Sequence, residues 1–146
     1  MSSVSDYQRS KVYAAEDAAF DKRKPPAIPA LHEVRAYMDM VIASQHWTKH
    51  KGWQRVRLED GRGRRSACYR SHKRSIAMPT WARSEWIVIH EMAHCLTHRT
   101  TGAASSHGTH FTWHYLMLVL ELLGQEAHDA LAEQFIGKGV KWHNLG

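Results

Sequence analysis

The sequence contains little cysteine and no long hydrophobic run. Only two cysteines, Cys68 and Cys95, occur in 146 residues, and they lack the paired spacing of a zinc ribbon. Two cysteines are too few for a disulfide-stabilised scaffold, so reduced thiols are expected. The longest nearly apolar stretch, at residues 115–123, is interrupted by Glu121 and is far shorter than a bilayer-spanning helix. These absences exclude a disulfide-rich domain and predict no transmembrane segment.

Residues 1–20 carry charged side chains where a secretory signal requires an unbroken apolar block. A cytoplasmic site of action is therefore expected. The chain is 43% hydrophobic and 23% charged, close to the average of globular proteins, and its length suits one domain. We expect an N-terminal arm or helix with a basic, proline-containing linker at residues 1–28, followed by a single domain at residues 29–146.

The hydrophobic pattern predicts an α+β fold with a small three-stranded sheet. Apolar residues spaced three and four apart predict helices, whereas short runs bounded by glycine or proline predict strands. Helices are expected at residues 31–45, 84–99, 107–123 and 126–135. Two strands, at residues 53–58 and 67–69, would form a hairpin with its turn at Asp60 and Gly61. A third short strand is expected at residues 75–78.

Histidine is abundant, since the chain has 12 and six of them fall between residues 90 and 114. Residues 90–94 read HEMAH and follow an apolar run on a predicted helix. Two histidines four residues apart lie on one side of a helix, so both imidazoles can bind one metal ion. Glu91 then lies beside them, where its carboxylate can take a proton from water whose acidity zinc has raised. The motif predicts a zinc site with His90, His94 and Glu91.

A catalytic zinc ion usually has three protein ligands, so one ligand remains to be found. His98 lies about 12 Å along the helix axis from His90, too far to share the ion. A polar stripe on the next helix, which we expect to face the HEMAH helix, supplies the candidates His107, His110, His114 and Glu121. His107 is favoured because Gly108, without a side chain, lets two helix ends approach closely. No mutual spacing indicates a site among His32, His46, His50, His72, His128 and His143.

Two histidine motifs carry a resemblance to a known family. HEMAH at residues 90–94, followed by HGTHF at residues 107–111, resembles the HExxH and HGxxF pattern of SprT-like zinc metallopeptidases. KVYAAE at residues 11–16 and the passage at residues 76–94 are similar to a small actinobacterial and actinophage family of metallohydrolases. SprT-like proteins often add a cysteine-rich zinc ribbon associated with DNA binding, and this chain lacks the cysteines for one.

The resemblance implies a minimal zincin-like domain, in which the small sheet packs on the HExxH helix and further helices. It also implies one zinc ion bound by His90, His94 and His107, with Glu91 as catalytic acid and base. The predicted function is a zinc-dependent hydrolase, specifically a metallopeptidase whose peptide or protein substrate lies along residues 75–78 as an edge strand. Hydrolysis of another amide or an ester would use the same site, and the sequence leaves this open.

A non-catalytic alternative follows from the charge of the chain. The formal net charge is +6, and basic residues are concentrated between residues 55 and 74. On the predicted hairpin they can make weak, salt-dependent contact with nucleic acid through Arg62, Arg64, Arg65 and Arg74, while zinc only stabilises the fold. Glu91 distinguishes the two hypotheses, because a structural zinc site has four protein ligands and needs no carboxylate beside an open position.

Overall fold

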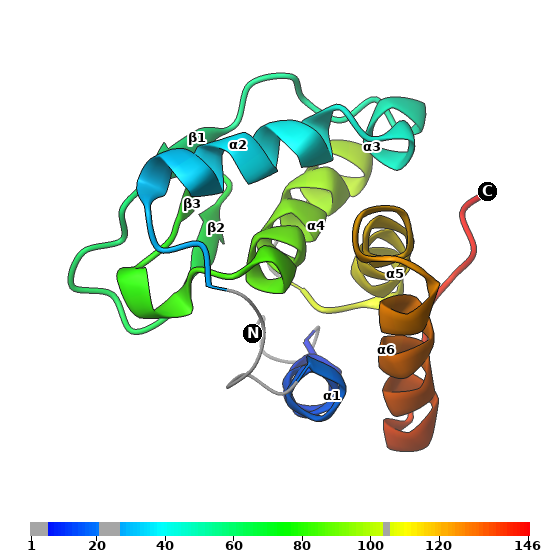
Figure 1. The fold of residues 1–146 in the computed structure, drawn as a ribbon. Helices are drawn as coiled ribbons and strands as arrows, with labels where there is room; N and C mark the ends of the chain where they lie inside the picture. The colour runs from blue at the N-terminus through cyan, green and yellow to red at the C-terminus, as the bar shows by residue number, and fades with distance from the viewer. Residues whose placement is uncertain (1–5, 21–26, 104–105) are drawn as a thin grey trace.

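The computed structural model describes residues 6–20, 27–103 and 106–146, in which six α-helices accompany one small sheet (Figure 1). The helices are α1 (Arg9–Phe20), α2 (Leu31–Ile42), α3 (Gln45–Lys49), α4 (Glu85–Thr101), α5 (Thr109–Leu123) and α6 (Gln125–Lys138). The strands are β1 (Arg57–Glu59), β2 (Cys68–Arg70) and β3 (Ser75–Ala77), and a 3₁₀ turn, η2 (Thr80–Ala82), leads into α4. The α+β prediction is confirmed at this level.

The sheet is mixed and has the strand order β1-β3-β2. β3 pairs in parallel with β1 and antiparallel with β2, where Tyr69 is opposite Ile76. β1 and β2 are therefore the two edges of the sheet and are not neighbours. The hairpin predicted from residues 53–58 and 67–69 is wrong, and so is the prediction that residues 75–78 form an edge strand.

Connection length and burial explain this strand order. Residues 60–67 connect β1 to β2, which is too long for a two-residue hairpin turn, and Gly61 and Gly63 adopt φ angles of 69° and 82° there. The tight turn lies instead at residues 71–74, between β2 and β3. All three residues of β3 are completely buried, as expected for the strand with a neighbour on each side.

Helix α4 runs through the middle of the molecule and carries the HEMAH sequence (Figure 1). It contacts α2, α5 and β2. Residues 88–97 form an uninterrupted buried run, so the helix has no broad solvent-exposed face over that length. Gly102 ends α4 with a φ of 83°, in the left-handed conformation that glycine adopts without steric cost. Any polar residue on the buried part of α4 therefore needs a partner.

Helix α1 packs against α6, and its Val12 and Ala15 are completely buried in the hydrophobic core. The segment predicted as an N-terminal arm or helix with a linker, residues 1–28, thus contributes a helix to the same core as residues 29–146. The basic linker predicted within it falls largely on residues 21–26, which lie outside the described residues. Because α1 is packed in this way, its polar side chains can reach the HEMAH helix.

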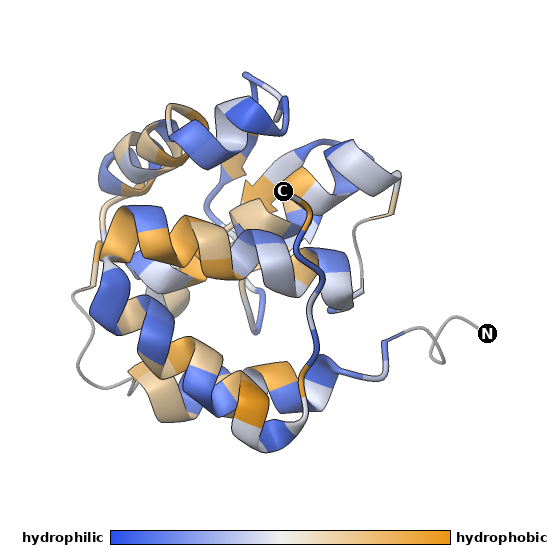
Figure 2. Cartoon of the chain, turned by 90° about the vertical axis from the view of Figure 1, so that its right-hand side faces the viewer, coloured by the Kyte–Doolittle hydropathy of each residue, from blue (hydrophilic) through white to orange (hydrophobic). Residues whose placement is uncertain are grey.

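Apolar residues from all six helices form the core. Most helices show both hydrophobic and hydrophilic residues in Figure 2, as expected of amphipathic helices around a shared interior. The largest completely buried side chains include Trp47, Phe111, Tyr115 and Phe135. Within the described ranges, no helix is long and apolar enough to cross a membrane.

Candidate metal centre

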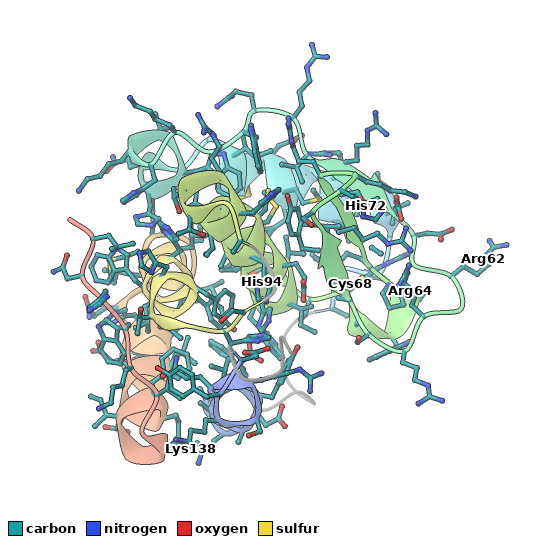
Figure 3. All side chains as sticks on the ribbon, turned by 180° about the vertical axis from the view of Figure 1, so that it is seen from behind. Arg62, Arg64, Cys68, His72, His94 and Lys138 are labelled. Carbon is teal, nitrogen blue, oxygen red and sulfur yellow. The ribbon has the colours of Figure 1, made fainter. Side chains whose placement is uncertain are left out.

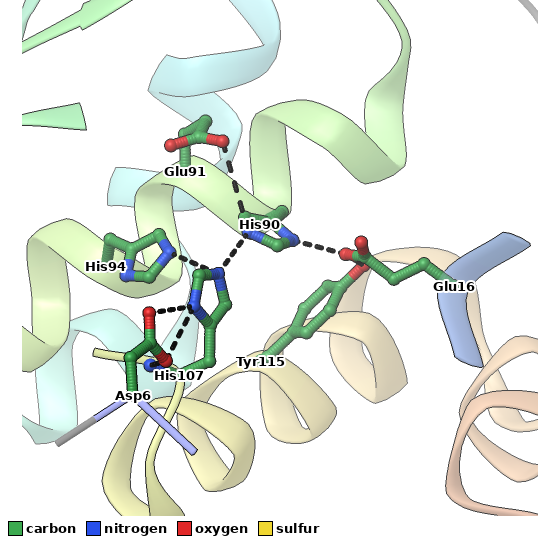
Figure 4. Close-up of polar contacts among 7 residues, drawn as sticks. All are labelled: Asp6, Glu16, His90, Glu91, His94, His107 and Tyr115. Atoms are coloured by element: carbon green, nitrogen blue, oxygen red, sulfur yellow. Dashed lines mark hydrogen bonds and ion pairs between the residues drawn. The ribbon is translucent and has the colours of Figure 1, made fainter. Parts of the chain in front are cut away.

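Three histidines from neighbouring segments meet in the interior. His90 and His94 lie one turn apart on α4, and His107 immediately precedes Gly108, the N-cap of α5. All three are buried, with 2%, 6% and 4% of their surface exposed. Nε2 of His107 lies 3.2 Å from Nε2 of His94 and 3.4 Å from Nε2 of His90 (Figure 4). The structure therefore brings together the three residues predicted as metal ligands.

The separations of these nitrogen atoms fit a single metal ion. Zinc–nitrogen bonds of about 2.0–2.1 Å in a tetrahedral site place neighbouring nitrogens about 3.3–3.4 Å apart. The two Nε2–Nε2 distances, 3.2 and 3.4 Å, are close to those values. Imidazole nitrogens are preferred by zinc and other divalent transition metals, whereas magnesium and calcium prefer oxygen. The three histidines can hold such an ion and leave a coordination position for another ligand.

Carboxylates orient two of the imidazoles through their Nδ1 atoms (Figure 4). Oε2 of Glu16, on α1, contacts Nδ1 of His90 and accepts a hydrogen bond of 2.6 Å from the hydroxyl of Tyr115. Both carboxylate oxygens of Asp6 lie 3.2 Å from Nδ1 of His107, whose backbone N–H donates to the same side chain at 2.9 Å. A proton held on Nδ1 in this way leaves the Nε2 lone pair for a metal ion.

Burial shifts the pKa values of two groups in this cluster, Glu91 and His107. Burial raises the pKa of Glu91; His90 and a backbone hydrogen bond from Tyr69 oppose the rise, and the carboxylate of Glu16 adds to it. Burial also lowers the pKa of His107 to about 4, with Asp6 partly opposing the change. A neutral imidazole is the form that binds metal, and a carboxylate with a raised pKa is a stronger base than an ordinary one.

Aromatic rings pack on the histidines of the cluster. Tyr13 is stacked on His90, with ring centroids 5.6 Å apart and an interplanar angle of 14°. Phe111 is stacked on His94, with centroids 4.2 Å apart and an angle of 20°. Tyr13 is 38% exposed, so its ring lies between His90 and the solvent. These contacts fix the planes of the two imidazoles and limit the access of water to them.

A pocket of about 150 Å³ opens beside Glu91 and His90. Apolar and aromatic side chains form most of its wall, among them Tyr13, Ala67, Trp81, Ala82, Trp86 and Ile87. Trp81 is 66% exposed, which is unusual for so large an apolar side chain. Oε2 of Glu91 lies 4.0 Å from Nε2 of His90, so this carboxylate borders both the pocket and the histidine cluster.

The polar residues predicted to face the HEMAH helix together, His107, His110, His114 and Glu121, point to different neighbours. That prediction is wrong for the stripe as a whole. His114 is completely buried, but its ring packs against His46 and His50 instead of the cluster on α4. Seven residues along a helix return to nearly the same side, yet they advance about 10.5 Å along the axis. His107 and His114 therefore meet different neighbours: His107 contacts His90 and His94, whereas His114 contacts His46 and Thr100, near the end of α4.

Glu121, His110 and His98 lie outside the α4 cluster. Both carboxylate oxygens of Glu121 accept hydrogen bonds, of 2.6 and 3.0 Å, from the first two backbone N–H groups of α3. Glu121 thus stabilises a helix N-terminus and is not a ligand of the α4 cluster. His110 is exposed. Nδ1 of His98 lies 2.9 Å from the hydroxyl of Tyr69, against the sheet.

Two pairs of residues were missed from the sequence: Asp6 with Glu16, and His46 with His50. Asp6 and Glu16 are separated by 101 and 74 positions from the histidines that they orient, and no local spacing links them. His46 and His50 are different, because they stand four residues apart, the spacing that marks the two histidines of HEMAH. The structure brings their rings together with His114 as a group that could hold a metal ion, which was not expected from the sequence.

The basic residues predicted to contact nucleic acid lie in two separate places. Arg62, Arg64 and Arg65 are exposed on the loop between β1 and β2, and the first two border a hollow of about 480 Å³. Figure 3 shows Arg62 and Arg64 on this loop, which projects at one side of the sheet. Arg74 borders another hollow of about 740 Å³, with its guanidinium carbon 4.2 Å from the centroid of the Trp53 ring. Because β1 and β2 are not neighbours, these arginines do not form one hairpin surface.

No protein-family model, curated protein or solved structure matches this chain. The resemblance to SprT-like metallopeptidases therefore rests on the residue motifs alone. Any function must be inferred from the positions and chemistry of the side chains.

Proposed function

We propose that this chain is a zinc-dependent metallopeptidase of the zincin type, similar to SprT-like enzymes. The proposal depends on one observation: three buried histidines meet beside the carboxylate of Glu91 at the border of an apolar pocket. A purely structural zinc site would not need a buried carboxylate with a raised pKa next to its ligands. Both cysteines are free thiols, which supports a cytoplasmic site of action.

In this proposal one zinc ion is held by the Nε2 atoms of His90, His94 and His107. When bound, zinc supplies a Lewis acid that polarises a carbonyl oxygen and increases the acidity of water. The carboxylates of Glu16 and Asp6 keep two of the ligand rings in the tautomer and orientation that binding requires.

Glu91 acts as the general base. Its Oε2, 4.0 Å from Nε2 of His90, accepts a proton from the attacking water and later delivers it to the leaving nitrogen. Burial raises the pKa of this carboxylate, which strengthens it as a base. The adjoining pocket is largely apolar and keeps bulk water away from the carboxylate.

In this proposal a peptide substrate lies along β2, at one edge of the sheet. β2 is an edge strand that contacts α4, and the backbone of its Tyr69 forms a hydrogen bond with Glu91. An extended peptide added to β2 would gain backbone hydrogen bonds along the strand and run past the carboxylate. The pocket lined by Trp81 and Trp86 can receive an apolar side chain beside the bond to be cut.

The experiment is a peptide-library cleavage screen of the full chain after reconstitution with zinc. The wild type is compared with Glu91→Gln, which keeps the size and hydrogen-bonding capacity of the side chain but removes the base. We expect the wild type to cleave peptides with an apolar residue next to the scissile bond. Glu91→Gln should retain the zinc content and lower the rate by at least about 100-fold, which is what general-base assistance contributes.

Glu85→Gln is the matched control, because Glu85 lies in the first turn of the same helix and is only half-buried. It should cleave at the wild-type rate. Equal rates for Glu91→Gln and the wild type would remove Glu91 from the mechanism. If zinc-loaded wild type cleaves no peptide but hydrolyses simple amides or esters, the site is a hydrolase of another substrate class. If it hydrolyses none of these, the catalytic proposal fails.

A non-catalytic zinc-stabilised module that binds nucleic acid is the second candidate. It is favoured by four exposed arginines, three of which border open hollows: Arg62, Arg64 and Arg74 border them, and Arg65 lies on the same loop as Arg62 and Arg64. Exposed guanidinium groups can contact phosphates without any specific base contact. This candidate gives no reason for the position of Glu91, which is why the catalytic proposal is preferred.

A further inference from the structure

A second group of three histidines lies outside the α4 cluster. His46 belongs to α3, His50 is the C-cap of that helix, and His114 lies on α5. Their ring centroids are 4.5 Å apart for His46 and His50, 5.2 Å for His46 and His114, and 5.0 Å for His50 and His114. One ring nitrogen of each lies within 4.8 Å of the others. The three imidazoles therefore converge on a common point.

Hydrogen bonds within the group account for the approach of His46 and His114 but not for the position of His50. Nε2 of His46 lies 2.9 Å from Nδ1 of His114, and Nε2 of His114 lies 3.3 Å from Oγ1 of Thr100. Nε2 of His50 is buried and has no hydrogen-bond partner among the residues that the structure describes. A buried polar atom in that position costs free energy, whereas a metal ion would give it a partner.

The protonation of the group also suits a metal ion. Burial lowers the pKa of His46 to about 4 and that of His114 to about 3, and nearby histidines lower both further. Burial, together with Lys49, also lowers the pKa of His50. The three rings are therefore neutral at pH 7, and a neutral imidazole offers the lone pair that a metal ion requires.

The backbone around these histidines is fixed by its own hydrogen bonds. Ser44, the N-cap of α3, accepts a hydrogen bond from the backbone N–H of Trp47. The carboxylate of Glu121, on α5, holds the first two N–H groups of α3. Trp47 is completely buried, and its indole N–H donates to the backbone oxygen of Trp53 at 2.9 Å. The short helix is thus anchored against α5 before any metal is bound, so the ligand positions are pre-organised.

We propose that His46, His50 and His114 form a second metal site, which binds Zn²⁺ and fastens α3 to α5. The ligand set contains only imidazole nitrogen, which suits zinc and excludes magnesium and calcium as preferred ions. Both oxygens of Glu121, the acidic side chain that contacts α3, accept backbone hydrogen bonds and do not act as a base. The site is structural, and it does not depend on the catalytic proposal for the α4 cluster.

Zinc binding to the full chain, first freed of metal with a chelator, tests the proposal. We expect two equivalents of zinc to bind to the wild type and one to His50→Gln. His94→Gln should also bind one equivalent, through the second site. The matched control is His110→Gln, an exposed histidine one helical turn from His114, which should still bind two equivalents. In His50→Gln the zinc affinity of the second site should fall at least about 100-fold. This is more than the loss expected when a residue that only orients a metal ligand is replaced.

A second measurement assigns the site without any substitution. Imidazole ¹⁵N resonances of the wild type are followed by NMR as zinc is added in two equivalents. The ring nitrogens of His46, His50 and His114 should shift with one equivalent and those of the α4 cluster with the other. In the single variant His94→Gln, zinc should still raise the melting temperature. In the double variant His94→Gln/His50→Gln, zinc should no longer raise it.

Three results would overturn the proposal. The first is a wild type that binds one equivalent of zinc, lost entirely in His94→Gln. The second is a folded His50→Gln that still binds two equivalents. The third is an absence of shifts at His46, His50 and His114 when zinc is in excess, which decides the question even if a variant does not fold.

Discussion

The carboxylate of Glu16 lies against Nδ1 of His90, although the two residues are 74 positions apart in the chain. Both side chains are almost completely buried, with 2% and 3% of the side-chain surface exposed. The hydroxyl of Tyr115, on α5, donates to the same oxygen of Glu16 at 2.6 Å. One residue of α1 thus links α4 and α5 at the proposed metal ligand, and this contact explains why α1 belongs to the site.

Removing the carboxylate of Glu16 should weaken metal binding at the α4 cluster. We expect Glu16→Ala to lower zinc affinity about 10- to 100-fold, because His90 loses the partner that sets its tautomer and orientation. Glu16→Gln, whose amide oxygen can still accept a hydrogen bond, should lose less. The affinity is measured by competition with a zinc indicator in the His50→Gln background, so that only this cluster contributes. Unchanged affinity in a folded Glu16→Ala would show that the contact does not support the ligand.

His107 and His110, both near the start of α5, should differ in their effect on metal binding. His107→Ala should lose the zinc of the α4 cluster by orders of magnitude, since it removes one of three converging nitrogens. His110→Ala should change little, because His110 is exposed and outside both histidine groups. Isothermal titration with zinc, after removal of metal, measures both variants. The opposite ranking would disprove the assignment of His107.

Replacing Gly52 should destabilise the fold near α3. A Cβ atom at this position would lie 2.3 Å from Cε2 and Nε1 of Trp47, which is completely buried. We expect Gly52→Ala to lower the free energy of unfolding by about 1–3 kcal/mol, as overpacking of a core usually does. Gly137→Ala is the control, because a Cβ there meets no atom within 4 Å. Urea denaturation in the presence of chelator compares the two, and equal stabilities would show that Trp47 can move without cost.

Any binding of nucleic acid should be weak and depend strongly on salt. Neutralising Arg62, Arg64 and Arg65 should weaken the binding more than neutralising Arg74 alone. The first three charges lie together on one loop, whereas Arg74 lies beside a different hollow. Fluorescence anisotropy with labelled DNA, at about 50 and about 200 mM salt, measures the affinity and its salt dependence. Binding that survives the higher salt, or the loss of all four charges, must have another basis.

Local spacing was enough to predict several features. His90 and His94 can be paired from the sequence, because a four-residue step on a helix places both rings on one side whatever surrounds them. The helices at residues 84–99 and 126–135 follow from their apolar periodicity for the same reason, and the structure has α4 and α6 there. His46 and His50 show the same local signal, so the sequence also contained this part of the second histidine group.

Contacts between distant segments were decided only by the tertiary structure. The order of the strands depends on which of them is buried from both sides, and β3 takes the centre although the pattern placed it at an edge. His114 joins His46 and His50, and not His107, because a helix advances along its axis and meets new neighbours. Glu16 reaches His90 because α1 packs against α6, and Asp6, just before α1, then lies against His107. Spacing determines which residues share a face, whereas packing determines what that face meets.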